Sequence, residues 1–303
     1  MIDVADLRKE YGGFVAVEGS SFSIDRGEVF GVVGHNGAGK TTTLKMLAGL
    51  IEPTDGTAVV AGHPAGSSAM QRRLGFLPEE SPLYEEMTPI SYLEFFADLY
   101  DVPDDVASER ITALLDRLDL EHRDRELGNM SKGMKRKVAI ARALVNDPDV
   151  LIFDEPASGL DPLTTNAILE FTLELSEEGK TVVFSAHNLF HVESICDRLV
   201  IMAEGEIVAR GTIEDIRSTY GGTSYHVFVS SGGTEVVGSD AIAAPVTEIV
   251  RENGDLRYVV RDLEGVDAVR DAVEAAGGSV TDIQTKTPSL EEIFLEVAGE
   301  AAA

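Results

Sequence analysis

The chain has 303 residues, 44% of them hydrophobic, and carries 53 acidic against 25 basic side chains, a net charge of −28 at pH 7. This length allows one large domain with a full core and a smaller second domain. The acidity excludes one class of partner: nucleic acid is bound through clustered cations, so we expect no nucleic-acid partner.

The cysteine content and the hydropathy pattern indicate the cellular compartment of the chain and whether it spans a membrane. Cys196 is the only cysteine, so the chain cannot form an intramolecular disulfide or a cysteine cluster for zinc. We expect it to be a small core residue in a reducing cytoplasm. No apolar run reaches about 18 residues, the length of a membrane-spanning helix, and the segment MIDVADLRKEYGG has no apolar signal. We therefore expect that the chain does not span a membrane by itself.

From residue 1 to about 220, apolar strand segments alternate with helical ones, which predicts an α/β domain with a largely parallel sheet. The segment EVFGVVG (28–34) reads as a strand, and KTTTLKMLAGL (40–50) reads as the helix that follows. DVLIF (149–153) and TVVFSA (181–186) are short apolar runs, typical of strands buried on both faces.

The strand pattern stops between about 83 and 128. There SYLEFFADLY (91–100) and ERITALLDRLDL (109–120) have helical periodicity. We predict a helical insert in the α/β domain.

After Gly221 and Gly222 the pattern changes, and we expect a second domain over 223–303. TEIVRENGDLRYVVRD (247–262) predicts two strands joined by a turn at Asn253 and Gly254. A helix over about 266–276 and a last strand over 279–285 complete a small α+β domain.

The segment GHNGAGKTTT (34–43) has the composition of a phosphate-binding loop between a strand and a helix. Gly34, Gly37 and Gly39 let the backbone wrap a phosphate, Lys40 can reach the β- and γ-phosphates, and the Thr41 hydroxyl can ligate Mg²⁺. Alone, this loop indicates only a P-loop nucleotide binder, which includes kinases, GTPases and motor ATPases.

The segment DVLIFDEPASGLDP narrows that choice. Asp154 ends an apolar strand and can hold Mg²⁺ directly or through water, while Glu155 can orient and deprotonate an attacking water. A small-molecule kinase needs that position free for its acceptor, so Glu155 disfavours a kinase. The alternative is that the two acids only complement the start of a helix.

The segment NMSKGMKRKVAIARAL (129–144) predicts a second helix whose start could bind an anion, besides the helix after the phosphate loop. Ser131 is a good N-cap and Gly133 leaves the first-turn amides bare, so this helix also offers an anion site.

The order and spacing of these motifs resemble the ATP-binding subunits of ABC transporters over residues 1 to about 220. The resemblance implies the P-loop ABC nucleotide-binding fold, with Glu155, His187 and Lys40 as catalytic residues and Thr41, Asp154 and Glu79 near Mg²⁺. It implies that ATP contacts Tyr11, which would stack on adenine, and Gly34, Asn36, Gly37, Ala38, Gly39, Lys40, Thr41, Thr42, Ser131, Gly133 and Asp161. Tyr11 could instead be a core aromatic. His187 and His191 share a helix face, but Asn188 stands where a zinc-protease motif needs Glu.

The resemblance also implies a head-to-tail dimer, in which the Ser131 helix of one copy caps the γ-phosphate of ATP held by the other. The two anion sites of one chain would then serve two ATP molecules. Two departures stand out: Lys132 and Met134 replace the usual Gly and Gln of the family signature. Glu79 replaces a glutamine, and a carboxylate there cannot donate a hydrogen bond unless protonated.

The closing segment TPSLEEIFLEVAGE (287–300) resembles that of ABC-2 subunits, which mostly drive export. The implied function is ATP hydrolysis that powers a separate transmembrane permease from the cytoplasmic face of the membrane. The permease, and not this chain, would select the cargo. An alternative is a soluble ABC ATPase that acts as a switch on a non-membrane partner. The charge of −28 further suggests a halophilic archaeon, in whose cytoplasm salt screens like-charge repulsion.

Overall fold

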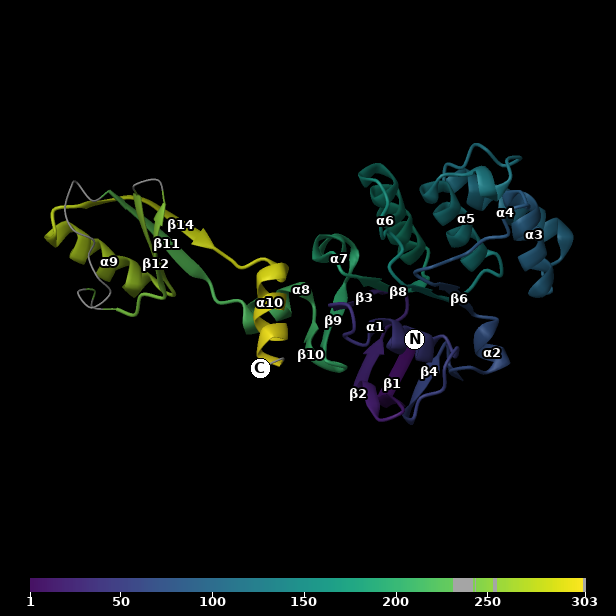
Figure 1. The fold of residues 1–303 in the computed structure, drawn as a ribbon, viewed down its shortest axis with the longest axis horizontal. Coiled ribbons are helices and arrows are strands. Elements are labelled where there is room, and N and C mark those ends of the chain that lie inside the picture. Colours follow the sequence, from purple (N-terminus) through teal and green to yellow (C-terminus); the bar gives the residue numbers. More distant parts are fainter. Residues whose placement is uncertain (231–241, 243, 253–254, 302–303) are drawn as a thin grey trace. The chain divides into compact units, whose positions relative to one another are not determined.

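The computed structural model describes residues 1–230, 242, 244–252 and 255–301. It divides into two compact units, Met1–Ile213 with Val297–Ala303, and Glu214–Glu296. Figure 1 labels the elements of each. The boundary expected at residues 221–222 stays a prediction.

The first unit opens with an antiparallel sheet in the order β2-β1-β4-β5. Its strands are β1 (Ile2–Tyr11), β2 (Phe14–Ile24), β4 (Asp55–Val60) and β5 (His63–Pro64). Gly12 and Gly13, with φ of 55° and 95°, form the turn between β1 and β2. The alternating pattern predicted one largely parallel sheet, and this separate antiparallel sheet was not predicted, because the pairing of β1 with β4 joins residues about 50 positions apart.

The second sheet has the order β10-β9-β3-β8-β7-β6. Its strands are β3 (Val29–Gly34), β6 (Leu74–Leu77), β7 (Val150–Phe153), β8 (Thr181–Ala186), β9 (Arg198–Ala203) and β10 (Glu206–Gly211). All neighbouring pairs are parallel except β9 and β10. Strands β3, β7 and β8 are buried along their whole length, which the apolar runs predicted for β7 and β8. The loops after β3, β8, β7 and β6 therefore lie next to one another along one edge.

Helices cover both faces of this sheet (Figure 1). Helix α1 (Lys40–Leu47) and the antiparallel sheet pack on one face, while α6 (Pro162–Glu177) and α7 (Leu189–Ile195) pack on the other. The core on the α1 side joins side chains of both sheets, among them Ile2, Leu7, Phe30, Val32, Leu44, Leu47, Ile152, Val183 and Val200. Cys196 is buried, as predicted. A short helix, α2 (Ser68–Gln71), precedes β6.

The helical insert contains α3 (Pro89–Leu99), α4 (Asp104–Arg117) and a 3-10 turn, η1 (Leu127–Asn129), before α5 (Lys132–Leu144). The predicted helical segments are thus confirmed. Arg142 of α5 ties the insert to the unit, since its Nη1 donates to the Tyr92 hydroxyl at 3.0 Å and its guanidinium lies 5.4 Å from the Phe96 ring centre.

The second unit has a four-stranded antiparallel sheet in the order β12-β13-β11-β14. Its strands are β11 (Ser224–Ser230), β12 (Glu248–Glu252), β13 (Asp255–Val260) and β14 (Ser279–Lys286), and its helices are α8 (Ile213–Tyr220) and α9 (Leu263–Ala275). The last helix, α10 (Leu290–Ala301), spans the division between the units.

The predicted α+β composition of this unit is present, with one correction. Helix α9 begins three residues before the expected start, because Oδ1 of Asp262 caps it by accepting from the Gly265 amide at 2.7 Å. The predicted turn residues Asn253 and Gly254 lie outside the described residues.

Within the described ranges, no helix combines the length and the apolar character that crossing a bilayer requires.

Candidate nucleotide-binding and catalytic site

One edge of the sheet, where the parallel strands end, brings together the phosphate loop, Glu79, Asp154, Glu155 and His187. The phosphate loop follows β3, His187 follows β8, Asp154 and Glu155 follow β7, and Glu79 follows β6. Because these four strands are neighbours in the sheet, sequence segments up to about 150 residues apart lie at one edge. Carboxyl ends of parallel strands are where open α/β sheets bind ligands.

At two positions of the loop only glycine fits. A Cβ on Gly34 would lie 2.5 Å from the Met202 carbonyl oxygen, and one on Gly39 would lie 2.7 Å from that of Ala16. Gly39 also has a left-handed φ of 102°. Asn36 and Gly37 are exposed, whereas Ala38 is buried.

Helix α1 begins directly after this loop. Its N-cap is Gly39, and no side chain caps it. The amides of its first turn, including those of Thr41 and Thr42, have no acceptor within the helix and favour an anion there. The position of α1 thus suits a phosphate.

Lys40 is buried at the same place, 6% exposed. Its Nζ donates to the carbonyl oxygens of Gly34 at 2.7 Å and His35 at 3.3 Å, and lies 3.8 Å from Oε1 of Glu155. The ammonium therefore stands between the loop and the carboxylate pair.

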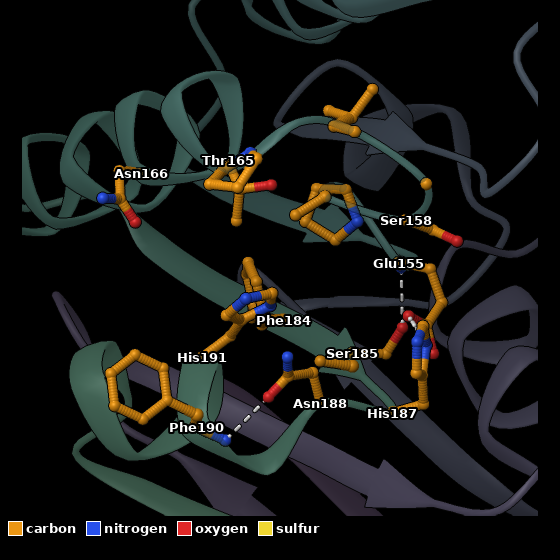
Figure 2. Close-up of a pocket in the computed structure, with 16 residues that line it drawn as sticks. Glu155, Ser158, Thr165, Asn166, Phe184, Ser185, His187, Asn188, Phe190 and His191 are labelled. Carbon is orange, nitrogen blue, oxygen red and sulfur yellow. Dashed lines mark hydrogen bonds and ion pairs between the residues drawn. The ribbon is translucent and has the colours of Figure 1, made fainter.

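The two carboxylates are both buried, and one hydroxyl bonds both the Asp154 side chain and the Glu155 backbone. Ser185 Oγ donates to Oδ1 of Asp154 at 2.7 Å and accepts from the amide of Glu155 at 2.9 Å. Figure 2 shows Ser185 beside Glu155 and His187. Ser185 was not predicted as a site residue, although it is a polar residue near the end of a buried strand, two positions before His187, which was a usable signal.

The Glu155 side chain also contacts a histidine. Its Oε2 lies 2.8 Å from Nδ1 of His187, whose side chain is 59% exposed (Figure 2). The φ of Glu155 is 49°, a region that non-glycine residues seldom occupy and that is concentrated at functional sites.

A pocket of about 400 Å³ opens on the side of Glu155 that faces α6 and α7. Its lining includes Gly159, Asn166, Phe190 and His191 but no residue of the phosphate loop. Burial lowers the pKa of His191, and His187 nearby lowers it further, so His191 is neutral at pH 7. The pocket therefore adjoins Glu155 and not the phosphate loop.

The residues expected near Mg²⁺ offer oxygen ligands of the kind this ion prefers. Thr41 lies in the first turn of α1 and supplies a hydroxyl, and Asp154 supplies a buried carboxylate. Glu79 has an exposed side chain. Among the described residues, no group of three or more His, Cys, Asp or Glu side chains gathers to bind a metal. The residues therefore fit an ion that completes its shell with nucleotide phosphates and water.

The second predicted anion site has the expected local structure. Ser131 caps α5, because its Oγ accepts from the Met134 amide at 3.2 Å. A Cβ on Gly133 would lie 3.1 Å from Cγ2 of Thr164, and one on Gly159 would touch Nζ of Lys132. Helix α5 lies with the insert, apart from α1 (Figure 1).

Two other expected nucleotide contacts have structural partners of their own. Asp161 caps α6: its Oδ1 accepts from the amides of Leu163 and Thr164, and its Oδ2 accepts from the Thr164 hydroxyl. These bonds from Thr164 lower the pKa of Asp161. Tyr11 ends β1, is 48% exposed and has Nζ of Lys9 5.0 Å from its ring centre. The nucleotide roles of both residues stay predictions.

Comparisons with known proteins agree with this geometry. Residues 17–158 match the family described as ABC transporter, and residues 211–298 match the C-terminal domain of DrrA1-3-like ATP-binding proteins. The linearmycin resistance ATP-binding protein of Bacillus subtilis is 32% identical over 99% of this chain and 98% of its own length.

Two solved structures are similar to the first unit. The ATP-binding subunit of an ABC transporter is 36% identical over 73% of this chain and 93% of its own, with a TM-score of 0.68. A bacterial ABC transporter cassette solved as a dimer is 25% identical over 70% of this chain and 99% of its own, with a TM-score of 0.65.

The fold and the site together define a P-loop ATPase with a helical insert. The chain belongs to the family of ABC transporter ATP-binding proteins and is an ABC-type ATP hydrolase.

Proposed function

We propose that this chain is the ATP-hydrolysing subunit of an ABC-2 type exporter, and that two copies close around ATP to drive transport. One observation carries the dimer: α1 and α5 each begin with amides suited to an anion, yet they lie in different parts of the unit (Figure 1). The similar cassette solved as a dimer supports the same arrangement.

In this mechanism the loop 34–42 holds the phosphates and Lys40 neutralises charge on the β- and γ-phosphates. Glu155 accepts the proton of the attacking water, and His187 holds the Glu155 carboxylate from its exposed side. Mg²⁺, held by Thr41 and Asp154, would polarise the phosphates. Glu79 would contact that ion or its water.

The second copy would complete each site. Ser131 and Gly133 at the start of α5 would cap the γ-phosphate bound by the partner's loop, so ATP joins the copies and its hydrolysis releases them. Lys132, at the first position of α5, adds a cation that the usual signature lacks.

The export class rests on the C-terminal region and on the similarity to a resistance protein. The partner would be a separate permease at the cytoplasmic face of the membrane. The helical insert offers it exposed apolar side chains, namely Tyr84, Phe95, Leu99 and Tyr100. Tyr84 and Phe95 are in edge contact, with ring centres 5.9 Å apart.

Co-expression with a candidate permease, a membrane protein from a neighbouring gene, tests this function. We expect the chain to fractionate with membranes only when that protein is present, and its ATP hydrolysis to respond to it. A chain that stays in the supernatant and hydrolyses ATP unchanged would favour the soluble switch instead.

A further inference from the structure

One arginine of α5 reaches the edge of the sheet where the carboxylate pair lies. Arg136 is the fifth residue after the cap Ser131 and is 9% exposed. Its five N–H donors bond to five different backbone carbonyl oxygens. Nε donates to Pro156 at 2.7 Å, Nη1 donates to Pro78 at 2.9 Å and Glu79 at 3.0 Å, and Nη2 donates to Asp154 at 3.2 Å and Glu155 at 2.6 Å.

This set of bonds requires a guanidinium. A lysine ammonium has three donors on one nitrogen and cannot reach five acceptors in a fork. Burial lowers the pKa of Arg136 to about 10, so the group is still charged at pH 7. A buried charge with every donor bonded fixes the geometry of its acceptors strongly.

Two of the five acceptors are the backbone carbonyls of Asp154 and Glu155. At Glu155 the chain has its left-handed φ of 49°, and both polar backbone atoms are held. The amide donates to Ser185 Oγ at 2.9 Å, and the carbonyl accepts from Arg136. An unfavourable backbone conformation persists only where its surroundings overdetermine it. These two bonds contribute to that at Glu155, together with the Ser158 amide, which donates to the same carbonyl at 3.2 Å.

We propose that Arg136 is a positioning residue for ATP hydrolysis. It holds the backbone of Glu155 in its left-handed conformation and links Glu155 to α5. This role rests on the proposed function, in which the Ser131 end of the same helix binds the second ATP. Arg136 thereby connects the helix that caps one nucleotide to the base that acts on the other. The same guanidinium holds the carbonyls of Pro78 and Glu79, at the entry to the helical insert.

The chain offers a matched control on the same helix. Arg142 is also partly buried, but it contacts the Tyr92 hydroxyl and the Phe96 ring of the insert, away from the carboxylates. Arg136→Lys and Arg142→Lys make the same chemical change. A difference in kcat between the two variants would therefore come from the position of Arg136, because both variants lose a guanidinium.

The test measures kcat, binding of a fluorescent ATP analogue, and the melting temperature of each variant. We expect Arg136→Lys to lower kcat about 10-fold or more while nucleotide affinity changes by less than about twofold, and Arg142→Lys to leave both close to wild type. Should Arg136→Lys show no folding transition, Arg136→Gln, a neutral side chain with two amide donors, takes its place in every measurement.

A double substitution separates positioning from a structural role. In the Glu155→Gln background the base is already lost, so Arg136→Lys should lower the residual rate by less than about twofold. Equal rate losses in both backgrounds, a parallel loss of kcat and nucleotide binding, or a kcat of Arg136→Lys close to wild type would each overturn the proposal. A wild-type chain that hydrolyses ATP without any ATP-dependent dimer would instead overturn the proposed closure and leave the effect of Arg136 on Glu155 standing.

Discussion

Nδ1 of His187 lies 2.8 Å from Oε2 of Glu155, while the other oxygen of that carboxylate faces Nζ of Lys40 at 3.8 Å. The carboxylate is 9% exposed and the imidazole is 59% exposed. The buried carboxylate of Glu155 thus contacts a solvent-exposed histidine on one side and the lysine of the phosphate loop on the other. This relationship joins residues that follow three different strands.

Replacing Glu155 by Gln should remove the base and leave the fold almost unchanged, because the amide has nearly the same shape. Turnover should fall by roughly 100-fold or more while ATP still binds. Because the nucleotide persists, the closed dimer should accumulate, and gel filtration with ATP and Mg²⁺ would detect it. Near-normal turnover would show that another group is the base.

Replacing Ser185 by Ala should affect both carboxylates at once. Oδ1 of Asp154 loses its buried donor and the Glu155 amide loses its acceptor, so we expect a loss of about 1–3 kcal/mol in unfolding free energy and a lower kcat. Urea unfolding and ATPase assays measure the two effects. Ser194→Ala is the control, because that exposed hydroxyl bonds only within α7. Equal behaviour of the two variants would contradict the bridging role of Ser185.

Mixing two inactive variants tests whether sites are shared between copies. Lys40→Ala damages the phosphate loop and Ser131→Arg blocks the α5 end, so neither homodimer has an intact site. In the mixed dimer both lesions fall in one site and the other site is whole, because a two-fold interface pairs each loop with the partner's helix. We expect part of the ATPase activity to return.

The companion experiment pairs wild type with the double variant Lys40→Ala plus Ser131→Arg. If each site were built within one chain, this dimer would keep one intact site, whereas the first mixture would have none. Activity in the second dimer but not in the first would therefore refute the shared site. Inactivity of both dimers would show that ATP hydrolysis requires both sites to be intact at once.

The net charge of −28 should make stability depend on salt, because screening removes repulsion within the compact state. We expect a higher melting temperature in molar KCl than at low KCl. Thermal unfolding monitored by circular dichroism at constant pH measures this difference. An unchanged midpoint would refute adaptation to a salt-rich cytoplasm without bearing on ATP hydrolysis.

The sequence by itself determined the features that depend on neighbouring residues. The strand, loop and helix around Lys40, the Ser131 cap and the paired acids after a buried strand were all readable. Apolar period, glycine placement and capping act over a few positions. The boundaries were less secure, as the early start of α9 at its Asp262 cap shows.

Only the tertiary structure decided which loops meet. Ser185 reaches Asp154 across 31 positions, and Arg136 reaches Glu155 across 19, through bonds whose donors give no periodic signal in the chain. The antiparallel sheet of β1 and β4 likewise depends on distant pairing. Local spacing encodes which element forms, whereas the partner of a buried donor is set by the order of strands in the sheet. The backbone conformation of Glu155 therefore depends on the tertiary fold and not on the local sequence around Asp154 and Glu155.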